Sequence, residues 1–128
     1  MEIITVLLIL WAIFAHWIAD FVFQAEVWAL NKKESFKALT QHTVTYTAMM
    51  ILLFFNILSP LHLLLFAVGL FTTHTLIDYI TSKIVGGKFA NKQLGGPIPN
   101  TGAFTMIGLD QVLHYVTILF LLYFCYNK

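Results

Sequence analysis

The chain has 128 residues, of which 59% are hydrophobic and 10% charged, and its formal net charge is +1. Its mean hydropathy of +0.83 excludes an ordinary soluble globular domain, and the near-neutral charge gives no basic footprint for nucleic acid. The length suits one small integral membrane unit, so residues 1–128 are expected to form a single domain. Cys125 is the only cysteine, which leaves no intrachain disulfide.

Long apolar runs predict four helices that cross a membrane. In chain order they cover about Ile3 to Gln24, Phe36 to Leu58, Leu61 to Val85 and Ala103 to Tyr126. Each run has at least the ~20 residues needed to cross ~30 Å of hydrocarbon at about 1.5 Å per residue. None shows the period-2 alternation of a β-strand. The expected fold is therefore all-α, a polytopic membrane protein with four transmembrane helices.

The connections between these helices predict the orientation of the chain. Ser59-Pro60 is a tight turn, segment 25–35 ends in polar residues, and segment 86–102 carries two Gly pairs and two Pro that exclude a regular helix. Six of the seven basic residues flank the first and third connections: Lys32, Lys33, Lys37, Lys83, Lys88 and Lys92. Positive-inside bias then places both connections in the cytoplasm and both termini outside, in the multi-pass topology expected of an inner-membrane protein.

Each Asp of the chain lies four residues from a His, inside these apolar segments. Residues four apart share one helix face, and ionisable groups inside a bilayer are usually functional because they are costly there. The order His then Asp reverses in the last helix, which runs in the opposite direction, so all three pairs are expected at one depth. The pairs are His16/Asp20, His74/Asp78 and Asp110/His114.

These pairs predict a divalent metal site. His42 of the second helix falls near the same level, with Tyr46 one turn deeper on the same face. Imidazole and carboxylate suit Zn, which we favour, with Mn or Fe as alternatives, and seven donors are enough for one or two ions. A metal would also offset the burial of three carboxylates. The expected ligands are His16, Asp20, His42, His74, Asp78, Asp110 and His114.

Simpler interpretations remain open for single residues. One His/Asp pair alone is equally typical of a hydrogen-bonded contact that fixes helix packing. Gln24 extends the His16 face by one turn, and Gln111 points about 100° away from its neighbour Asp110, so both are expected behind the ligands at most. The loop lysines are interpreted as orientation signals, with contact to an anionic substrate as the lesser alternative.

The ordered motifs resemble a known family. His16-x-x-x-Asp20-Phe21-x-x-Gln24, the lone His42, His74-x-x-Ile77-Asp78 and Asp110-Gln111-x-x-His114 together resemble the domain-of-unknown-function 3307 family, small bacterial and phage-associated membrane proteins. The resemblance spans nearly the whole chain. It implies a four-helix membrane protein with a polar centre, and it implies no particular reaction.

Three functions follow as hypotheses, and whether the chain is an enzyme stays open. The first is a metal-dependent hydrolase that acts on a lipid or lipid-linked substrate at the cytoplasmic leaflet, with Asp78 or Asp110 as general base and loop 86–102 as a lid. The second is a proton or metal-ion pathway through the His/Asp cluster. The third is a non-catalytic membrane interaction protein with a structural centre. The expected partners are membrane lipid and, under any hypothesis, further copies of the chain.

Overall fold

The computed structural model describes residues 2–126, and within this range every regular element is a helix. The all-α prediction is confirmed. In chain order the elements are α1 (Ile3–Trp17), the π-helical turn η1 (Ile18–Val22), α2 (Glu26–Asn31), α3 (Phe36–Phe54), α4 (Pro60–Ala90) and α5 (Ala103–Tyr126).

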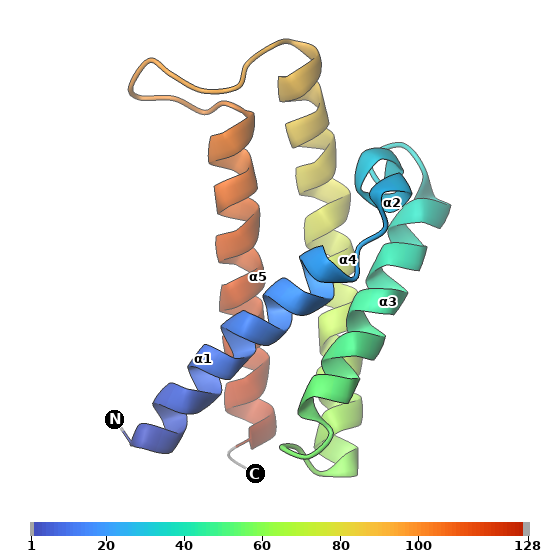
Figure 1. The fold of residues 1–128 in the computed structure, drawn as a ribbon, viewed down its shortest axis with the longest axis vertical. Coiled ribbons are helices and arrows are strands. Elements are labelled where there is room, and N and C mark those ends of the chain that lie inside the picture. Colours follow the sequence, from blue (N-terminus) through green and yellow to red (C-terminus); the bar gives the residue numbers. More distant parts are fainter. Residues whose placement is uncertain (1, 127–128) are drawn as a thin grey trace.

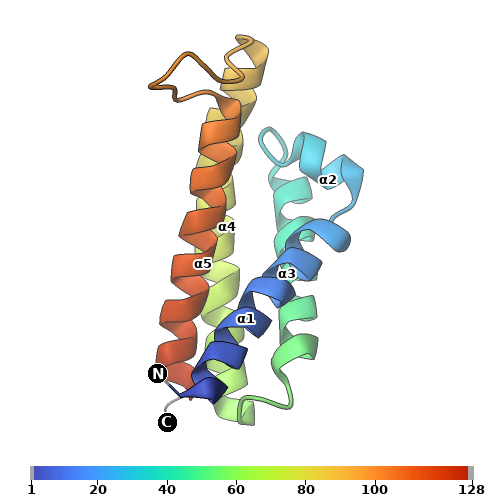
Figure 2. The ribbon, with the colours of Figure 1, turned by 60° about the vertical axis from the view of Figure 1, so that its left-hand side comes forward.

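The helices form an elongated bundle (Figure 1). The longest helices, α4 and α5, run side by side in opposite directions, α3 lies along α4, and α1 crosses the bundle obliquely (Figures 1 and 2). The start of α1, the end of α5 and the turn before α4 lie at one end of the bundle (Figure 1). The loop that joins α4 to α5 lies at the opposite end (Figure 1). Only α4 and α5 reach both ends, whereas α1 and α3 extend from the first end over part of the length (Figures 1 and 2).

Two serines set where the long helices begin. Ser35 accepts a hydrogen bond from the backbone N–H of Ala38 at the start of α3, as an N-cap does. Ser59 likewise accepts a hydrogen bond from the backbone N–H of His62 at the start of α4. Pro60 follows at the first helical position, where a backbone N–H would have no partner within the helix, so its absence costs nothing. The predicted tight turn at Ser59-Pro60 is confirmed.

Three predicted boundaries shift. α3 ends at Phe54 rather than Leu58, and segment 25–35, expected to be a loop, contains the short helix α2. α4 runs on to Ala90 through the pair Gly86-Gly87, so the irregular loop covers only 91–102. The prediction that both Gly pairs exclude helix was wrong for this one, because a helical Gly costs only about 1 kcal/mol against Ala.

Within residues 2–126, three helices and not the four predicted are long and apolar enough to cross a membrane: Ile3–Val22, Pro60–Ala90 and Ala103–Tyr126. α3 does not qualify because its first half is polar, with Lys37, Gln41, His42 and two threonines within eight residues. Its polar side chains His42, Thr43 and Tyr46 are buried against the other helices. Two of these polar residues, His42 and Tyr46, belong to the centre described below.

A dry apolar core fills the end of the bundle near the chain termini. Its buried members come from all four long helices and include Ala12, Met50, Phe54, Phe66, Leu70, Ile118 and Leu122. Many large apolar side chains on the outer faces are exposed instead, for example Leu64 and Phe120. An apolar surface of that extent is what a helix bundle turns toward lipid.

Candidate metal centre

A π-helical turn places Asp20 at the centre of the bundle. η1 continues α1 directly, and the backbone N–H of Phe23 donates to the carbonyl of Ile18, five residues back. Single π-turns inside α-helices are frequent at functional sites. Asp20 and His16 are both buried, and His16 Nε2 lies 3.6 Å from Asp20 Oδ2. The predicted pair is therefore in contact, across a local change of helix type.

Four side chains from η1, α3 and α4 direct their donor atoms at one point. The group is Asp20, His42, His74 and Asp78, all buried, with one donor atom of each within 4.8 Å of the others. His42 Nε2 lies 3.0 Å from Asp20 Oδ1 and 3.1 Å from Asp78 Oδ2. His74 Nε2 lies 3.4 and 3.6 Å from the same two oxygens, and the two Nε2 atoms are 3.1 Å apart.

These separations fit a tetrahedral metal ion. Bonds of about 2.0–2.1 Å in tetrahedral geometry keep the donor atoms roughly 3.3–3.4 Å apart, and the distances above scatter around that value. Asp20 Oδ1 is buried and accepts no hydrogen bond within the described chain, although it faces both imidazoles. A buried carboxylate oxygen without a hydrogen-bond donor is costly unless a cation supplies the missing partner.

A second donor group adjoins the first and shares Asp78 with it. His114 Nε2 lies 3.1 Å from Asp78 Oδ1 and 3.4 Å from Asp110 Oδ1. Asp78, Asp110 and His114 together meet the same 4.8 Å criterion. Asp78 thus turns Oδ2 toward the first group and Oδ1 toward the second. One carboxylate that faces two donor groups is the arrangement that bridges two metal ions in carboxylate-rich helix bundles.

His16, the seventh predicted ligand, has both ring nitrogens engaged elsewhere. Gln111 Nε2 donates to Asp110 Oδ2 at 2.9 Å, which turns Gln111 Oε1 toward His16 Nε2 at 3.0 Å. His16 Nε2 must then donate, and His16 Nδ1 accepts from the Tyr46 hydroxyl at 3.0 Å. Within the described residues His16 belongs to neither donor group. The contacts make it a positioning residue for Gln111 and Tyr46.

Stacked rings hold His74 in place. The Tyr46 ring lies on one side of it, with centroids 3.7 Å apart and planes 14° from parallel. The His114 ring lies 4.2 Å away at 27°. These contacts fix the plane of the His74 ring and so the direction in which Nε2 points.

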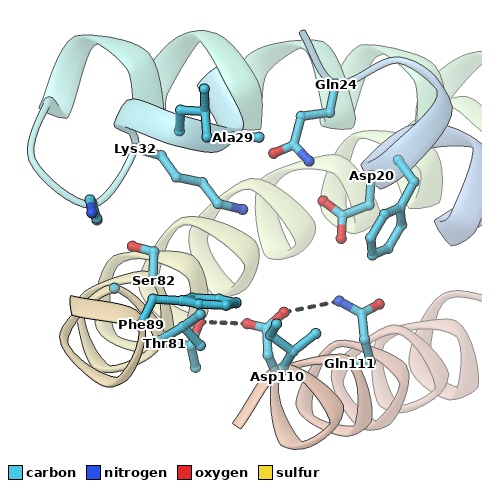
Figure 3. Close-up of a pocket in the computed structure, with 15 residues that line it drawn as sticks. Asp20, Gln24, Ala29, Lys32, Thr81, Ser82, Phe89, Asp110 and Gln111 are labelled. Atoms are coloured by element: carbon cyan, nitrogen blue, oxygen red, sulfur yellow. Dashed lines mark hydrogen bonds between the residues drawn. The ribbon is translucent and has the colours of Figure 1, made fainter. Parts of the chain in front are cut away.

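A pocket of ≈470 Å³ opens beside the two donor groups, between η1, α2, α4 and α5. Figure 3 shows Lys32 extending from α2 into this space, with Asp110 and Gln111 of α5 across from it. Asp20 and Asp110 line the pocket, whereas Asp78 does not. The volume is within the range of small-molecule sites.

The model for the family described as protein of unknown function (DUF3307) matches residues 4–128. The chain belongs to this family. Neither the curated proteins nor the solved structures gave a match. The bacterial and phage association implied by the resemblance stays a prediction for this DUF3307 chain.

The sequence analysis did not identify two site residues of this DUF3307 chain, Lys32 and Thr81. Lys32, interpreted as an orientation signal, places Nζ 2.7 Å from Asp78 Oδ2. Gln111 was expected behind the ligands at most, and its amide does lie there, where it joins Asp110 to His16. Thr81 Oγ1 contacts Asp110 Oδ1. Only Thr81 had a usable signal, because it follows Asp78 by three residues and so shares its helix face.

Proposed function

We propose that the protein is a membrane-embedded metal-dependent hydrolase that acts on a lipid or lipid-linked substrate at the cytoplasmic leaflet. The observation that supports this most is the shared Asp78, which joins a fully buried donor group to a second one, whose Asp110 is half-buried, beside a pocket. Bound metal would supply an activated water and polarise the bond under attack. Zn suits the tetrahedral spacing of the first group best, with Mn or Fe as alternatives.

When only the first donor group holds metal, Asp110 is left without a metal ion and is the residue best suited to act as general base. It lines the pocket, and Gln111 and Thr81 hold its two oxygens in place. In hydrolysis the water oxygen bonds to the acyl carbon or phosphorus, the bond to the leaving atom breaks, and the water proton passes through the base to the leaving group. Asp78 faces both donor groups and not the pocket, which suits a bridging ligand better than a base.

The lysine distribution supports an orientation with both termini on the outer side and the pocket at the cytoplasmic leaflet. Lys32, Lys33 and Lys37 lie at the α2–α3 end, Lys88 lies in the last turn of α4, and Lys92 lies in the loop 91–102. Both of these regions lie away from the chain termini (Figure 1). Basic residues that gather beside one end of the helices favour the cytoplasmic side for that end.

An ion pathway is less well supported. The His/Asp centre borders the dry core of Met50, Phe54, Phe66 and Ile118, which fills the bundle toward the termini. A proton or metal ion would need a polar route through that end of the bundle.

The proposal is tested by turnover. The detergent-purified protein, loaded with Zn or Mn, is assayed against lipid esters, lipid amides and phosphoester lipids, beside His74→Ala and the exposed-site control Lys37→Gln, which lies outside the pocket. We expect metal-dependent hydrolysis of one class, lost in His74→Ala and retained in Lys37→Gln. Turnover that His74→Ala leaves unchanged, or no turnover of any class by metal-loaded protein, would overturn the proposal.

A further inference from the structure

The charges around the pocket favour an anionic ligand once metal is bound. Lys32 and Lys33 line it together with Asp20 and Asp110. Counting Asp78 behind them, three carboxylates face two ammonium groups, so a single bound dication makes the balance of these five groups positive, and the exposed Glu34, 3.9 Å from Lys33 Nζ, offsets part of that charge. A second dication makes the balance more positive. Partly enclosed sites strengthen such fields, and a metal ion is often the largest charge in them.

The two lysines reach the pocket by different routes. Lys32 extends inward until Nζ contacts Asp78, with its side chain 17% exposed. Lys33 lies across α4 at Gly86, where a Cβ would come within 2.6 Å of Lys33 Cδ. Only a glycine leaves that path open. One ammonium group therefore stands next to the metal donors and the other nearer the rim.

The rest of the wall is apolar. Phe21, Leu30, Val85, Phe89 and Ile107 line the pocket, and Phe21, Leu30 and Phe89 are also exposed on the outer surface of the bundle. In a helix bundle that lies in a membrane, these side chains connect the pocket to the acyl-chain region. A ligand that fits both parts of the wall has an anionic head and an apolar tail.

We propose that the pocket binds an anionic phospholipid headgroup, with the phosphate between Lys32, Lys33 and the metal centre and the start of an acyl chain along Phe21, Leu30 and Phe89. This inference rests on the proposed function, because the metal supplies part of the positive charge. Phosphate suits the site because its several oxygens contact two ammonium groups and a metal ion at once.

The test measures binding by isothermal titration to the full-length, Zn-loaded protein in a nonionic detergent. The probes are inorganic phosphate, dihexanoyl phosphatidic acid and dihexanoyl phosphatidylcholine. The variants are Lys32→Gln, Lys33→Gln and Phe89→Ala, with Lys37→Gln as the matched control, because Lys37 is exposed on α3 and does not line the pocket. Metal content and lipid turnover are recorded on the same samples.

We expect phosphatidic acid to bind more tightly than the other two probes. Each of Lys32→Gln and Lys33→Gln should weaken it roughly tenfold, since a charged hydrogen bond is lost, while Lys37→Gln changes nothing. Phe89→Ala should weaken phosphatidic acid and spare inorganic phosphate. Binding without turnover would support this inference and count against the hydrolase.

Two results would overturn the inference while leaving the metal site intact. One is equal binding of phosphatidic acid and phosphatidylcholine by metal-loaded protein, which would show that the pocket does not select for a negatively charged headgroup. The other is equal binding of inorganic phosphate and phosphatidic acid, unaffected by Phe89→Ala, which assigns the site to the free anion. Failure of the wild type to retain metal would overturn the proposed function itself, and the inference with it.

Discussion

Lys32 Nζ lies 2.7 Å from Asp78 Oδ2, so an ammonium group rests against the carboxylate that faces both donor groups. The contact joins α2, which carries few other anchors, to the middle of α4. It also places a positive charge where a divalent ion would bind. Lysine and metal therefore compete for the same oxygen, and opposite consequences follow for metal affinity and for anion binding.

Lys32→Gln is expected to raise metal affinity several-fold, because removal of a like charge within a few ångströms of the ion lessens repulsion in a partly buried site. A competition titration against a chelating dye measures the metal affinity of each protein. Lys37→Gln is the control and should leave that affinity unchanged. A clear drop in affinity for Lys32→Gln would show instead that the Lys32–Asp78 contact is needed to assemble the donors.

His16→Ala separates a positioning residue from a ligand. Both nitrogens of His16 are used by Tyr46 and Gln111, so we expect the variant to retain metal while turnover falls about tenfold or more, as Asp110 loses its orientation through Gln111. Elemental analysis and turnover are measured together, beside His74→Ala. If His16→Ala loses metal as completely as His74→Ala, His16 is a ligand, as the sequence predicted.

Gly86→Ala should weaken phosphatidic acid binding without lowering the thermal stability of the protein. The helix gains about 1 kcal/mol in propensity, while the new Cβ displaces the Lys33 side chain from the pocket. Phosphatidic acid binding is expected to weaken several-fold with the melting temperature unchanged or higher. Gly87→Ala is the matched control, because among the described residues no atom lies within 4 Å of its Cβ position. Equal binding by the two variants would contradict the role given to Lys33.

Gly102→Ala should destabilise the loop 91–102. A Cβ there would lie 2.5 Å from the backbone carbonyl of Leu94, and the loop is closed next to it by the hydrogen bond from Ala103 N to Gln93 O. Backbone must move, at a cost of about 1–3 kcal/mol. Thermal unfolding in detergent measures it against Gly95→Ala, whose Cβ would meet only Asn100 Oδ1 at 3.7 Å. Identical unfolding temperatures for the two variants would refute the predicted clash at residue 102.

Much of this architecture could be predicted from the sequence. Hydropathy predicted α5 to the residue, and the four-residue spacing placed the His/Asp pairs on common faces that meet in the bundle. The prediction that α3 crosses a membrane was wrong because the apolar second half of this helix is offset by a polar first half that contains Lys37, Gln41 and His42. Helix periodicity also cannot register the π-turn at Asp20, which changes the angle per residue locally.

The remaining site contacts depend on long side chains that reach across the bundle. Lys32 crosses from α2 to α4, and the amide of Gln111 reaches sideways around α5 to His16. Neither contact follows from sequence spacing, since the partners are 46 and 95 residues apart. Only the packed arrangement of the helices brings them together.

The most direct test of the metal centre is elemental analysis of detergent-purified protein after dialysis against a weak chelator, with Asp78→Asn and the exposed-site control Glu34→Gln beside it. Because Asp78 faces both donor groups, we predict one or two equivalents of Zn, Mn or Fe in the wild type and in Glu34→Gln, and almost none in folded Asp78→Asn. Background metal in all three folded proteins, or full occupancy in Asp78→Asn, would contradict the account.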